Sequence, residues 1–442
     1  MAAQDVSLAS LAATISETTK AINALLEQNG APAPSFAADG PVDYPRHPEL
    51  AGLRFQLIDA ASDLYRLALG PSDHGLMQPL FLNHDALVLD TLNQFDFWNA
   101  VPLDGSATIA EISKHTTLPQ SLVRRFLAWA YTSRLFAPHG GPGSDAVVHS
   151  SLSAAMVKKP LLRSWLRHNL QEARPASVHT PESFWKYSAG RDAASEEPSE
   201  AGFTLANVDR LEKPEGYWDY LKRSVEGKPE GYRAKEFANA MEAAASASAL
   251  GEEELLKAGY DWASLGEATV VDVGGSNGHT GLILTNAFPN LKFVVQDLPE
   301  VEAAYESHIP ADVRAKVSYE VRDFFTPQAT AGDVYMLKMI LHDWPDKYAL
   351  QILTPLVPHL RNGSRLLLCE VVAPPPEAPL PPTLRRILTC SDLQMLLAFN
   401  SLERTAEHWK TLVKRLDPGL DVVSISDIPG SIHNFIEIKF TG

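Results

Sequence analysis

Short apolar runs alternate with amphipathic helical segments in the second half of the chain. Five apolar runs have the length and composition of buried strands: 269–273, 292–295, 317–321, 334–339 and 365–372. Three segments between them have helical periodicity: 279–287, 301–307 and 346–360. Such alternation is typical of a parallel-rich sheet with helices on both faces. We therefore expect an α/β domain over residues 261–442.

The N-terminal part shows apolar positions at three- and four-residue steps. This spacing predicts helices over 5–28 and 50–69, joined by a Pro/Ala/Gly-rich linker at 30–48. We assign residues 1–75 to a helical segment with its linker. Its apolar faces could pad the core or pack against a second copy of the chain, and we favour the second copy.

Residues 76–185 carry a winged helix-turn-helix pattern. It consists of two short helices and two short strands: 107–116, 121–131, 134–138 and 146–149. The pattern could serve DNA readout or dimerisation. Arg124 and Arg125 lie on the second helix without a surrounding basic stripe, so we expect a dimerisation module. Residues 186–260 form a helical linker or lid region, whose polar insertion at 188–232 is either part of a lid or a solvated loop.

Composition narrows the function classes. The formal net charge of −16 disfavours nucleic acid as a partner. Two cysteines, Cys369 and Cys390, give neither a disulfide framework nor a zinc spacing, and no ligand cluster for another metal is evident. No apolar stretch of about 18 residues and no secretory signal pattern occurs, so we expect a cytoplasmic protein with no membrane partner.

Polar residues follow the predicted strands, where ligands of open α/β sheets bind. The first turn reads Asp272-Val273-Gly274-Gly275-Ser276-Asn277-Gly278. A dinucleotide fingerprint needs three glycines at fixed positions, and here Gly274, Ser276 and His279 occupy them. A nicotinamide site is therefore disfavoured, and a phosphate-binding P-loop fails because no Gly-Lys-Ser/Thr follows.

Two aspartates at strand ends are candidate nucleoside ligands. Asp297 could accept hydrogen bonds from ribose hydroxyls, or it could cap the helix that Pro299 opens. Asp323 could accept from an adenine amino group while Phe324 stacks on the base. The alternatives are an ordinary turn aspartate and a core phenylalanine.

The chain resembles the small-molecule O-methyltransferase family, which includes plant caffeate-type and fungal secondary-metabolite enzymes. Five segments carry the resemblance: 270–275, 294–299, 322–325, 341–346 and 403–405. Their order and spacing match over roughly residues 80 to 440. The resemblance implies a Rossmann-like domain that binds S-adenosylmethionine, preceded by an all-α/winged-helix dimerisation domain, and a homodimer.

The resemblance also implies residue roles. His342 would be the general base, flanked by Glu370 and Glu403. Cofactor-binding positions would be Asp272, Gly274, Gly275, Asp297, Leu298, Asp323, Phe324 and Lys338. Acceptor-binding positions would be Asp343, Met395, Phe399, Phe237 and Met241, although methionines and aromatics at helical spacing are also typical of a core. The chain departs from the family at Ser276, where glycine is common, and at Ser401 and Leu402, where Gly and Lys are frequent.

These residue types suit methyl transfer to a hydroxyl. A phenol, with a pKa of about 10, is mostly protonated at neutral pH, and a histidine can take its proton as the new bond forms. Such base catalysis is typically worth about 100- to 10,000-fold. A glutamate on the other ring nitrogen would fix the tautomer and stabilise the imidazolium, as in serine hydrolases.

A second hypothesis keeps the fold but transfers no methyl group. Some fungal relatives are pericyclases or dehydratases, in which Lys338 or His342 would polarise a carbonyl. The complete set of His342, Glu370 and Glu403 favours methyl transfer to a small aromatic or polyketide-type molecule. A third hypothesis, a non-catalytic winged-helix regulator, leaves the cofactor positions unexplained.

Overall fold

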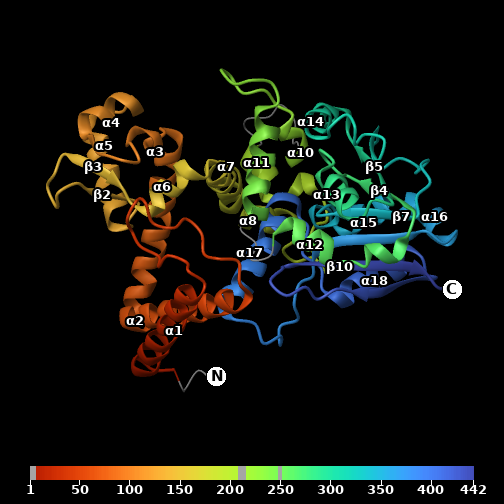
Figure 1. Cartoon of the computed structure of the whole chain (residues 1–442), viewed down its shortest axis with the longest axis horizontal. Helices are drawn as coiled ribbons and strands as arrows, with labels where there is room; N and C mark the ends of the chain where they lie inside the picture. The colour runs from red at the N-terminus through yellow and green to blue at the C-terminus, as the bar shows by residue number, and fades with distance from the viewer. Residues whose placement is uncertain (1–5, 208–215, 247–250) are drawn as a thin grey trace. The chain divides into compact units, whose positions relative to one another are not determined.

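The computed structural model describes residues 6–207, 216–246 and 251–442 and divides into two compact units (Figure 1). The first unit consists of Met1–Pro175, Leu221–Ala247 and Pro381–Leu384. The second consists of Ala176–Tyr220, Ser248–Leu380 and Arg385–Gly442. The parts of the expected linker at 208–215 and 247–250 lie outside the described residues.

Two helices begin the first unit. Ser7 caps α1 (Leu8–Gln28), and Ile22 and Leu26 of α1 pack with Leu50 of α2 (Pro48–Gln94). The helix predicted over 50–69 ends at a break in α2, where Gly70 has φ 72° and ψ 163°. Unlike the prediction, the helix resumes at Pro71 and continues to Gln94, because proline is tolerated in a first helical turn.

The winged helix-turn-helix pattern is confirmed. Its helices are α3 (Phe97–Ala100), α4 (Ile109–Thr116), α5 (Gln120–Thr132) and α6 (Ser151–Lys158). Its three strands, β1 (Ala107–Thr108), β2 (Phe136–Pro138) and β3 (Ala146–His149), pair in the antiparallel order β1-β3-β2. Residues 107–108 were predicted as helix, but they form β1. Thr108 then caps α4 in a capping box with Glu111.

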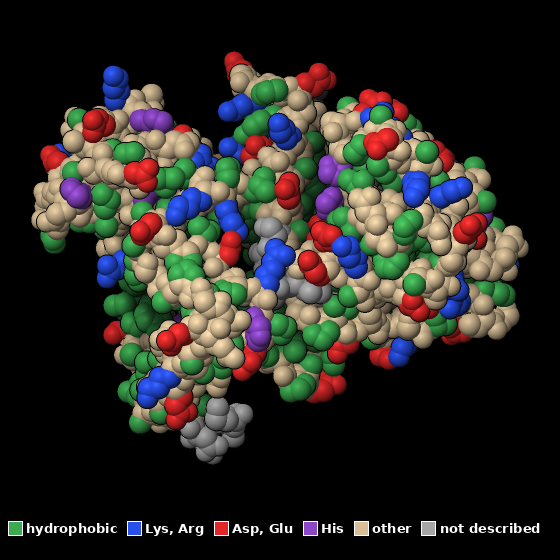
Figure 2. All heavy atoms as spheres, in the orientation of Figure 1, with side chains coloured by type: hydrophobic (Ala, Val, Ile, Leu, Met, Phe, Trp, Pro, Cys, Tyr) green, Lys and Arg blue, Asp and Glu red, His purple; other side chains and the backbone are tan. Residues whose placement is uncertain are grey.

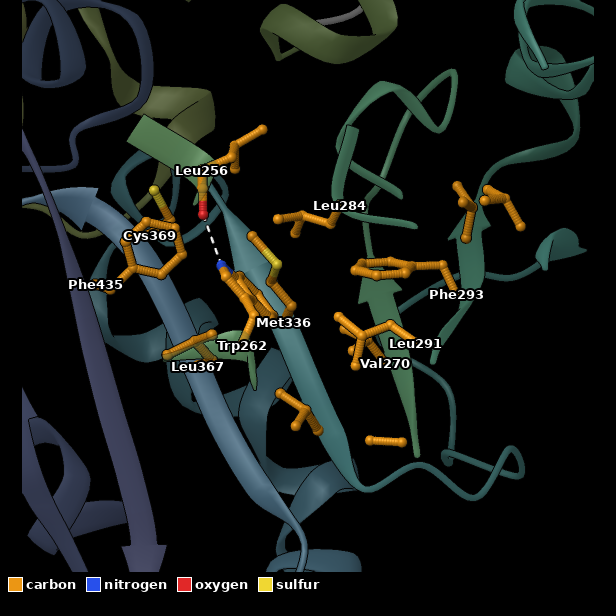
Figure 3. Close-up of a cluster of buried hydrophobic side chains, with 14 of the residues drawn as sticks. Leu256, Trp262, Val270, Leu284, Leu291, Phe293, Met336, Leu367, Cys369 and Phe435 are labelled. Carbon is orange, nitrogen blue, oxygen red and sulfur yellow. Dashed lines mark hydrogen bonds between the residues drawn. The ribbon is translucent and has the colours of Figure 1, made fainter. Parts of the chain in front are cut away.

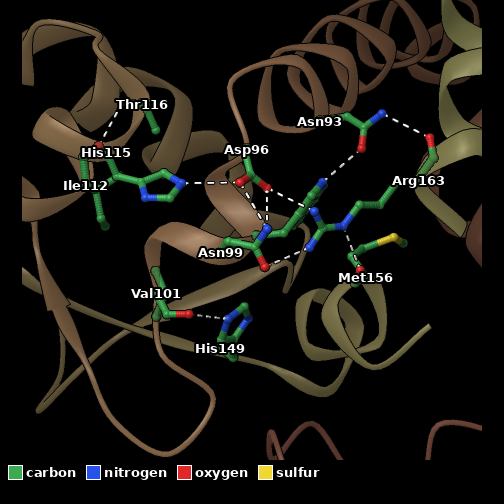
Figure 4. Close-up of polar contacts among 11 residues, drawn as sticks. Asn93, Asp96, Asn99, Val101, Ile112, His115, Thr116, His149, Met156 and Arg163 are labelled. Atoms are coloured by element: carbon green, nitrogen blue, oxygen red, sulfur yellow. Dashed lines mark hydrogen bonds and ion pairs between the residues drawn. The ribbon is translucent and has the colours of Figure 1, made fainter. Parts of the chain in front are cut away.

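A polar network ties this module together (Figure 4). Arg163 of α7 (Leu161–Arg167) donates from Nη1 to Asp96 at 3.0 Å and from Nε to the carbonyl of Met156 at 2.8 Å. His115 Nε2 lies 3.2 Å from the same Asp96 carboxylate. On α5, Arg124 forms a two-pronged ion pair with Asp145. On the face in Figure 2, Lys and Arg side chains stand among Asp and Glu.

The helical chain after α7 passes through a π-helical turn, η2 (His168–Ala173), into α8 (Arg174–Tyr187). α11 (Tyr232–Ser246) packs against α7, where Glu236 accepts a hydrogen bond from Ser164 at 3.0 Å and pairs with Arg167 at 3.1 Å. These contacts join the segment after residue 221 to the first unit.

The second unit is built on a seven-stranded sheet in the order β6-β5-β4-β7-β8-β10-β9. The strands are β4 (Ala268–Val273), β5 (Leu291–Asp297), β6 (Val317–Val321), β7 (Val334–Lys338), β8 (Arg365–Val371), β9 (Leu420–Ile425) and β10 (His433–Phe440). The predicted parallel arrangement is confirmed for β4 to β8. Strands β9 and β10 were not predicted, and β10 runs antiparallel to both of its neighbours.

Helices cover both faces of this sheet. On one face, α12 (Glu252–Ala258), α13 (His279–Ala287) and α14 (Glu302–His308) pack on a core that includes Val270, Met336 and Phe293 (Figure 3). On the other face, α15 (Asp346–Leu353), α16 (Val357–Arg361) and α18 (Ala406–Leu416) pack on a core that includes Val271 and Tyr335. The single helix predicted over 346–360 is wrong, because the 3₁₀ turn η8 (Thr354–Leu356) separates α15 from α16 at Pro355.

The insertion after α8 forms three short helices: η3 (Pro198–Glu200), α9 (Gly202–Asn207) and α10 (Tyr217–Leu221). Phe203 is buried, and its ring centroid lies 4.8 Å from that of Tyr217. Glu197 accepts from Tyr348 Oη at 2.7 Å and also pairs with Lys347. The solvated-loop interpretation is therefore wrong for this part of the insertion. No helix within residues 6–207, 216–246 and 251–442 has the length and apolar character to cross a membrane.

Candidate active site

The carboxyl ends of neighbouring parallel strands bring four charged side chains to one edge of the sheet in the second unit. Asp272 lies near the end of β4, Asp297 ends β5, Lys338 ends β7 and Glu370 lies near the end of β8. The register pairs Val273 with Gln296 and Lys338 with Cys369. The edge predicted from the sequence is therefore formed by these strand ends.

The turn after β4 brings backbone amides to this edge. Gly274 donates to the carbonyl of Gln296 at 2.8 Å and has φ +74°, and a Cβ there would lie 2.7 Å from Ile340 Cδ1. Ser276, the departure from the family pattern, also has a positive φ of 52°. Left-handed backbone costs an L-residue about 1–2 kcal/mol, which explains why glycine suits the position.

Asp297 anchors this turn. Its Oδ2 accepts from the amide of Ser276 at 2.8 Å and its Oδ1 from the amide of Leu298 at 2.7 Å. It does not cap η6 (Pro299–Val301), whose N-cap is Leu298 without a side-chain bond. Burial raises the pKa of Asp297 while the two amides oppose that rise. Each carboxylate oxygen has a further lone pair that can accept a hydroxyl.

Asp272 and Lys338 are oppositely charged groups at the centre of the edge. Asp272 is 1% exposed, burial raises its pKa to about 7, and its Oδ2 has no hydrogen-bond partner among the described residues. Lys338 Nζ lies 2.8 Å from Glu252 Oε1. Burial lowers the pKa of Lys338, but the charge of Glu252 outweighs it and the net shift is upward.

Asp323 and Phe324 lie after the end of β6. Asp323 is exposed and its Oδ1 accepts from the amide of Phe325 at 2.9 Å, which is a turn contact. The ring of Phe324 stands edge-on to Trp344, with centroids 5.9 Å apart. Both side chains have local contacts, and a role at an adenine stays a prediction.

His342 is buried in the 3₁₀ turn η7 (Leu341–Asp343) that follows β7. Its Nδ1 lies 3.1 Å from Glu403 Oε1, and its Nε2 lies 3.6 Å from Asp343 Oδ1. Burial lowers the pKa of His342, but Asp343 and Glu403 outweigh burial and raise it to about 10. The structure thus brings His342 together with Glu403, one of the two glutamates that the sequence suggested.

Glu403 is held by its own set of contacts. Its Oε1 accepts from Ser391 Oγ at 2.6 Å, and its amide donates to Asp392 Oδ1 at 2.9 Å; both partners lie on α17 (Pro382–Phe399). Burial raises the pKa of Glu403, but the bonds from His342 and Ser391 outweigh burial and lower it. Glu403 therefore faces His342 as a carboxylate.

Glu370 occupies a different place from the one expected. Its Oε1 accepts from the amides of Ile340 at 3.1 Å and Leu341 at 2.8 Å, so these bonds hold the backbone of the His342 turn rather than the ring. Burial raises the pKa of Glu370 to about 7. The expected role of Glu370 as a direct partner of the His342 ring is therefore replaced by a contact with the backbone of the turn.

The acceptor-pocket residues are not brought together in one unit. Met395 and Phe399 are buried on α17, where Phe399 stacks on Trp218 with ring centroids 5.6 Å apart. Phe237 and Met241 lie on α11 in the first unit, where Phe237 contacts the ring of His168. Met395 and Phe399 are buried like core side chains, Phe237 and Met241 are half-buried, and an acceptor-binding role for the four stays a prediction.

Three residues near His342 and Lys338 were missed by sequence reasoning. Glu252 pairs with Lys338, Ser391 bonds to Glu403, and Arg404 donates to the carbonyl of Leu341 at 2.7 Å. Arg404 lies in a segment that carried the family resemblance, so that segment was the available signal. Glu252 and Ser391 give no comparable sequence signal.

The edge fits a nucleoside that carries an amino-acid end. The glycine turn leaves room for close backbone approach, Asp297 has free lone pairs, and the unpartnered Asp272 oxygen suits a cationic donor. S-adenosylmethionine has this combination of ribose hydroxyls and an α-ammonium group.

Comparisons with known proteins point to the same cofactor and to O-methyltransferases. Residues 227–416 match the O-methyltransferase domain family. O-methyltransferase lcsG of Purpureocillium lilacinum is 33% identical, with 95% of this chain and 91% of that protein covered. The crystal structure of OxaC, also solved with SAH and oxaline, has a TM-score of 0.76 at 20% identity and covers 99% of this chain and 100% of that one. A pericyclic reaction enzyme has a TM-score of 0.67 at 21% identity, with 96% and 98% covered.

The two structures show a shared fold, and the sequence relationship shows the family. With the strand-edge geometry and a relative at this identity over nearly its whole length, the chain belongs to the S-adenosylmethionine-dependent O-methyltransferases.

Proposed function

We propose that the chain methylates a hydroxyl group of a small aromatic or polyketide-type natural product, with His342 as the base. The observation that carries this proposal is the buried imidazole placed 3.1 Å from Glu403. A relative named as a biosynthetic-cluster O-methyltransferase, from Cladonia grayi, supports this class of acceptor.

Each residue has a part in this proposal. Asp297 would hold the ribose, Asp323 and Phe324 the adenine, and Asp272 and Lys338 the amino-acid end. When bound, S-adenosylmethionine supplies a methyl group on a positively charged sulfur. His342 would take the acceptor's hydroxyl proton at Nε2, because Nδ1 faces Glu403. The Glu403 carboxylate would stabilise the resulting imidazolium.

The direct test is mass spectrometry of products formed from resorcinol, orsellinic acid and 1,8-dihydroxyanthraquinone with S-adenosylmethionine. A gain of one methyl group supports transfer. Recovery of all three phenols without a gain in mass would count against transfer and favour the pericyclic alternative, in which Lys338 or His342 polarises a carbonyl.

His342→Gln tests the base. We expect methyl transfer to fall at least about 100-fold, because the amide cannot accept the proton, while affinity for S-adenosylhomocysteine changes little. His179→Gln is the matched control, since His179 is partly exposed on α8 and pairs with Glu182. Full turnover by His342→Gln would refute the assignment.

The homodimer belongs to the same proposal. After the break at Gly70, Leu76, Leu80 and Leu87 lie on one face of α2 by helical spacing and are 73%, 54% and 45% exposed. A run of exposed leucines on one helix face favours a subunit contact. The cytoplasmic location expected from the sequence stays a prediction, to be checked by microscopy of a fluorescent fusion.

A further inference from the structure

The turn that carries His342 is too short to fix its own geometry. η7 spans only Leu341–Asp343, and the preceding Met339 has a positive φ of 54°. A single 3₁₀ turn satisfies few of its backbone groups internally, so its conformation depends on outside partners. The described structure supplies these partners from two buried polar side chains, Glu370 and Arg404.

The first of these side chains is Glu370, which binds the amide side of the turn. Its carboxylate accepts from Ile340 and Leu341, as described above, and is fully buried. Two hydrogen bonds to one buried carboxyl oxygen hold the start of the turn, because a buried amide that lost its acceptor would be left unsatisfied.

The second is Arg404, which binds the carbonyl side. It donates from Nη1 to the carbonyl of Leu341 and from Nη2 to the carbonyl of Trp344, both at 2.7 Å. Its Nε donates to Asp346 Oδ1 at 2.9 Å. The two carbonyls lie on either side of His342, so the planar guanidinium spans the turn.

Arg404 is paired well enough to remain buried as a cation. It is 1% exposed, and its guanidinium carbon lies 5.0 Å from the ring centroid of Trp409. Asp346 provides the counter-charge and also binds His408 and Arg415 through Oδ2, each at 2.9 Å. Removing one member of a buried charge network is costly, so this arrangement is a specific anchor.

Arg404 also follows Glu403 directly in the chain. The same short segment therefore carries the carboxylate that faces His342 Nδ1 and the guanidinium that holds the His342 backbone. Any movement of this segment changes both contacts together.

We propose that Arg404 is a positioning residue for methyl transfer, which holds the turn at residues 341–344 so that His342 faces Glu403 with Nδ1 and the acceptor with Nε2. The proposal rests on the proposed function in so far as His342 is the base. A misplacement of about 1 Å in a catalytic group can cost on the order of 100-fold in rate.

The experiment compares Arg404→Met and Arg404→Lys with Arg415→Met in the full chain. Arg404→Met is expected to lower kcat at least about 30-fold with KM and affinity for S-adenosylhomocysteine changed less than about threefold, because the cofactor residues are untouched. Arg404→Lys should lose at least about tenfold, since one ammonium cannot span two carbonyls and Asp346.

Arg415→Met removes a partner of the same Asp346 without touching the turn, and should stay within about threefold of the parent. If Arg404→Met does not fold, as judged by melting and S-adenosylhomocysteine binding, Arg404→Lys decides. A kcat within threefold of the parent in a folded Arg404 variant overturns the proposal.

Two further measurements separate positioning from general stability. In a His342→Gln background, Arg404→Met should cause no further loss of kcat, whereas independent losses would overturn the proposal.

In chains with ¹⁵N-labelled histidine, His342 should titrate at lower pH in Arg404→Lys than in the parent, because its contact with Glu403 loosens. An unchanged titration of His342 in Arg404→Lys overturns the positioning role of Arg404. Full activity of His342→Gln would instead refute only the assignment of His342 as the base.

Discussion

His342 lies among carboxylates, and this environment determines how it would act as a base. Asp343 and Glu403 raise its pKa to about 10 against the effect of burial, so the imidazole holds a proton at neutral pH in the free site. A neutral histidine with a neutral hydroxyl has the same number of protons as an imidazolium with the deprotonated acceptor. Either way, one proton must leave the site before methyl transfer.

This requirement predicts the pH dependence. We expect kcat/KM to rise from pH 6 to pH 9, since the deprotonated fraction grows as pH approaches the folded pKa of His342. Glu403→Gln removes a charge that raises this pKa, so the rising limb should move to lower pH while the maximal rate falls. A flat parent profile between pH 6 and 9 would contradict the assignment.

Asp272 gives a stability prediction. Burial raises its pKa to about 7, above the ordinary value of 3.8, so the folded chain binds this proton more tightly than the unfolded chain. Ionisation of Asp272 therefore lowers the free energy of unfolding, on the order of 2–4 kcal/mol. This loss is absent well below pH 4 and complete above pH 7.

Asp272→Asn should therefore raise Tm more at pH 8 than at pH 5, measured by differential scanning fluorimetry. It should also weaken S-adenosylhomocysteine binding, because the free carboxylate oxygen is lost. Asp312→Asn, at an exposed aspartate, is the control. An equal Tm change at both pH values would show that ionisation of Asp272 does not destabilise the folded chain.

Site residues next to strand ends could be identified from the sequence, but their partners far away in the chain could not. Asp297 and His342 were found because polar residues after apolar runs mark the carboxyl edge of a sheet. Glu252 meets Lys338 across 86 positions and Arg404 meets Leu341 across 63, and no periodicity links such pairs. Glu370 was found as a residue, but its bonds to backbone amides required the fold.

Elements with strong periodicity were predicted well, and elements without it were not. Strands β4, β7 and β8 are buried along almost their whole length and therefore appear as nearly continuous apolar runs. Strand β10 contains Glu437 and Lys439 among its apolar residues, so its sequence lacks the continuous apolar run that identifies a buried strand. Helix breaks also escaped prediction, as Thr354–Leu356 shows, because local proline effects compete with the helical pattern.

The break in α2 gives an element-scale prediction. Gly70 has φ 72° and ψ 163°, a region that essentially only glycine adopts, and a Cβ there would meet no atom within 4 Å. Gly70→Ala should therefore destabilise the chain by about 1–3 kcal/mol through backbone strain alone.

Gly75→Ala is the matched control, since Gly75 lies in the same helix with equally open surroundings. It should be neutral or stabilising by up to about 1 kcal/mol, because alanine favours helix. Urea unfolding measures both variants, and equal effects would show that α2 is not strained at Gly70.

For the whole molecule, the fold and the family could be predicted from the sequence, whereas the acceptor could be predicted only as a broad chemical class. The winged-helix pattern and the alternating half each appear in the structure, and the relatives place the chain among the O-methyltransferases. The acceptor cannot be named from sequence because Phe237, Met241, Met395 and Phe399 look alike whether they line a pocket or fill a core. Side-chain packing decides between the two, and a single sequence does not encode packing locally.

The proposed homodimer is testable through α2. Mass photometry should give twice the mass of one chain, and Leu76→Lys with Leu80→Lys should shift the population to the monomer, because charges on this face oppose burial. Leu8→Lys, at an exposed leucine on α1, is the control. A parent chain that is monomeric at micromolar concentration would refute the dimer.

The position of β10 has a consequence for synthesis. This strand is the last in sequence, yet it pairs with β8 on one side and β9 on the other. While residues before 433 are emerging from the ribosome, the side of β8 that later pairs with β10 has no neighbouring strand. Its backbone amides and carbonyls are then open to other nascent chains. Translation that stops before residue 433 should therefore yield a product that needs chaperones and aggregates, although every residue of the candidate site has already been made.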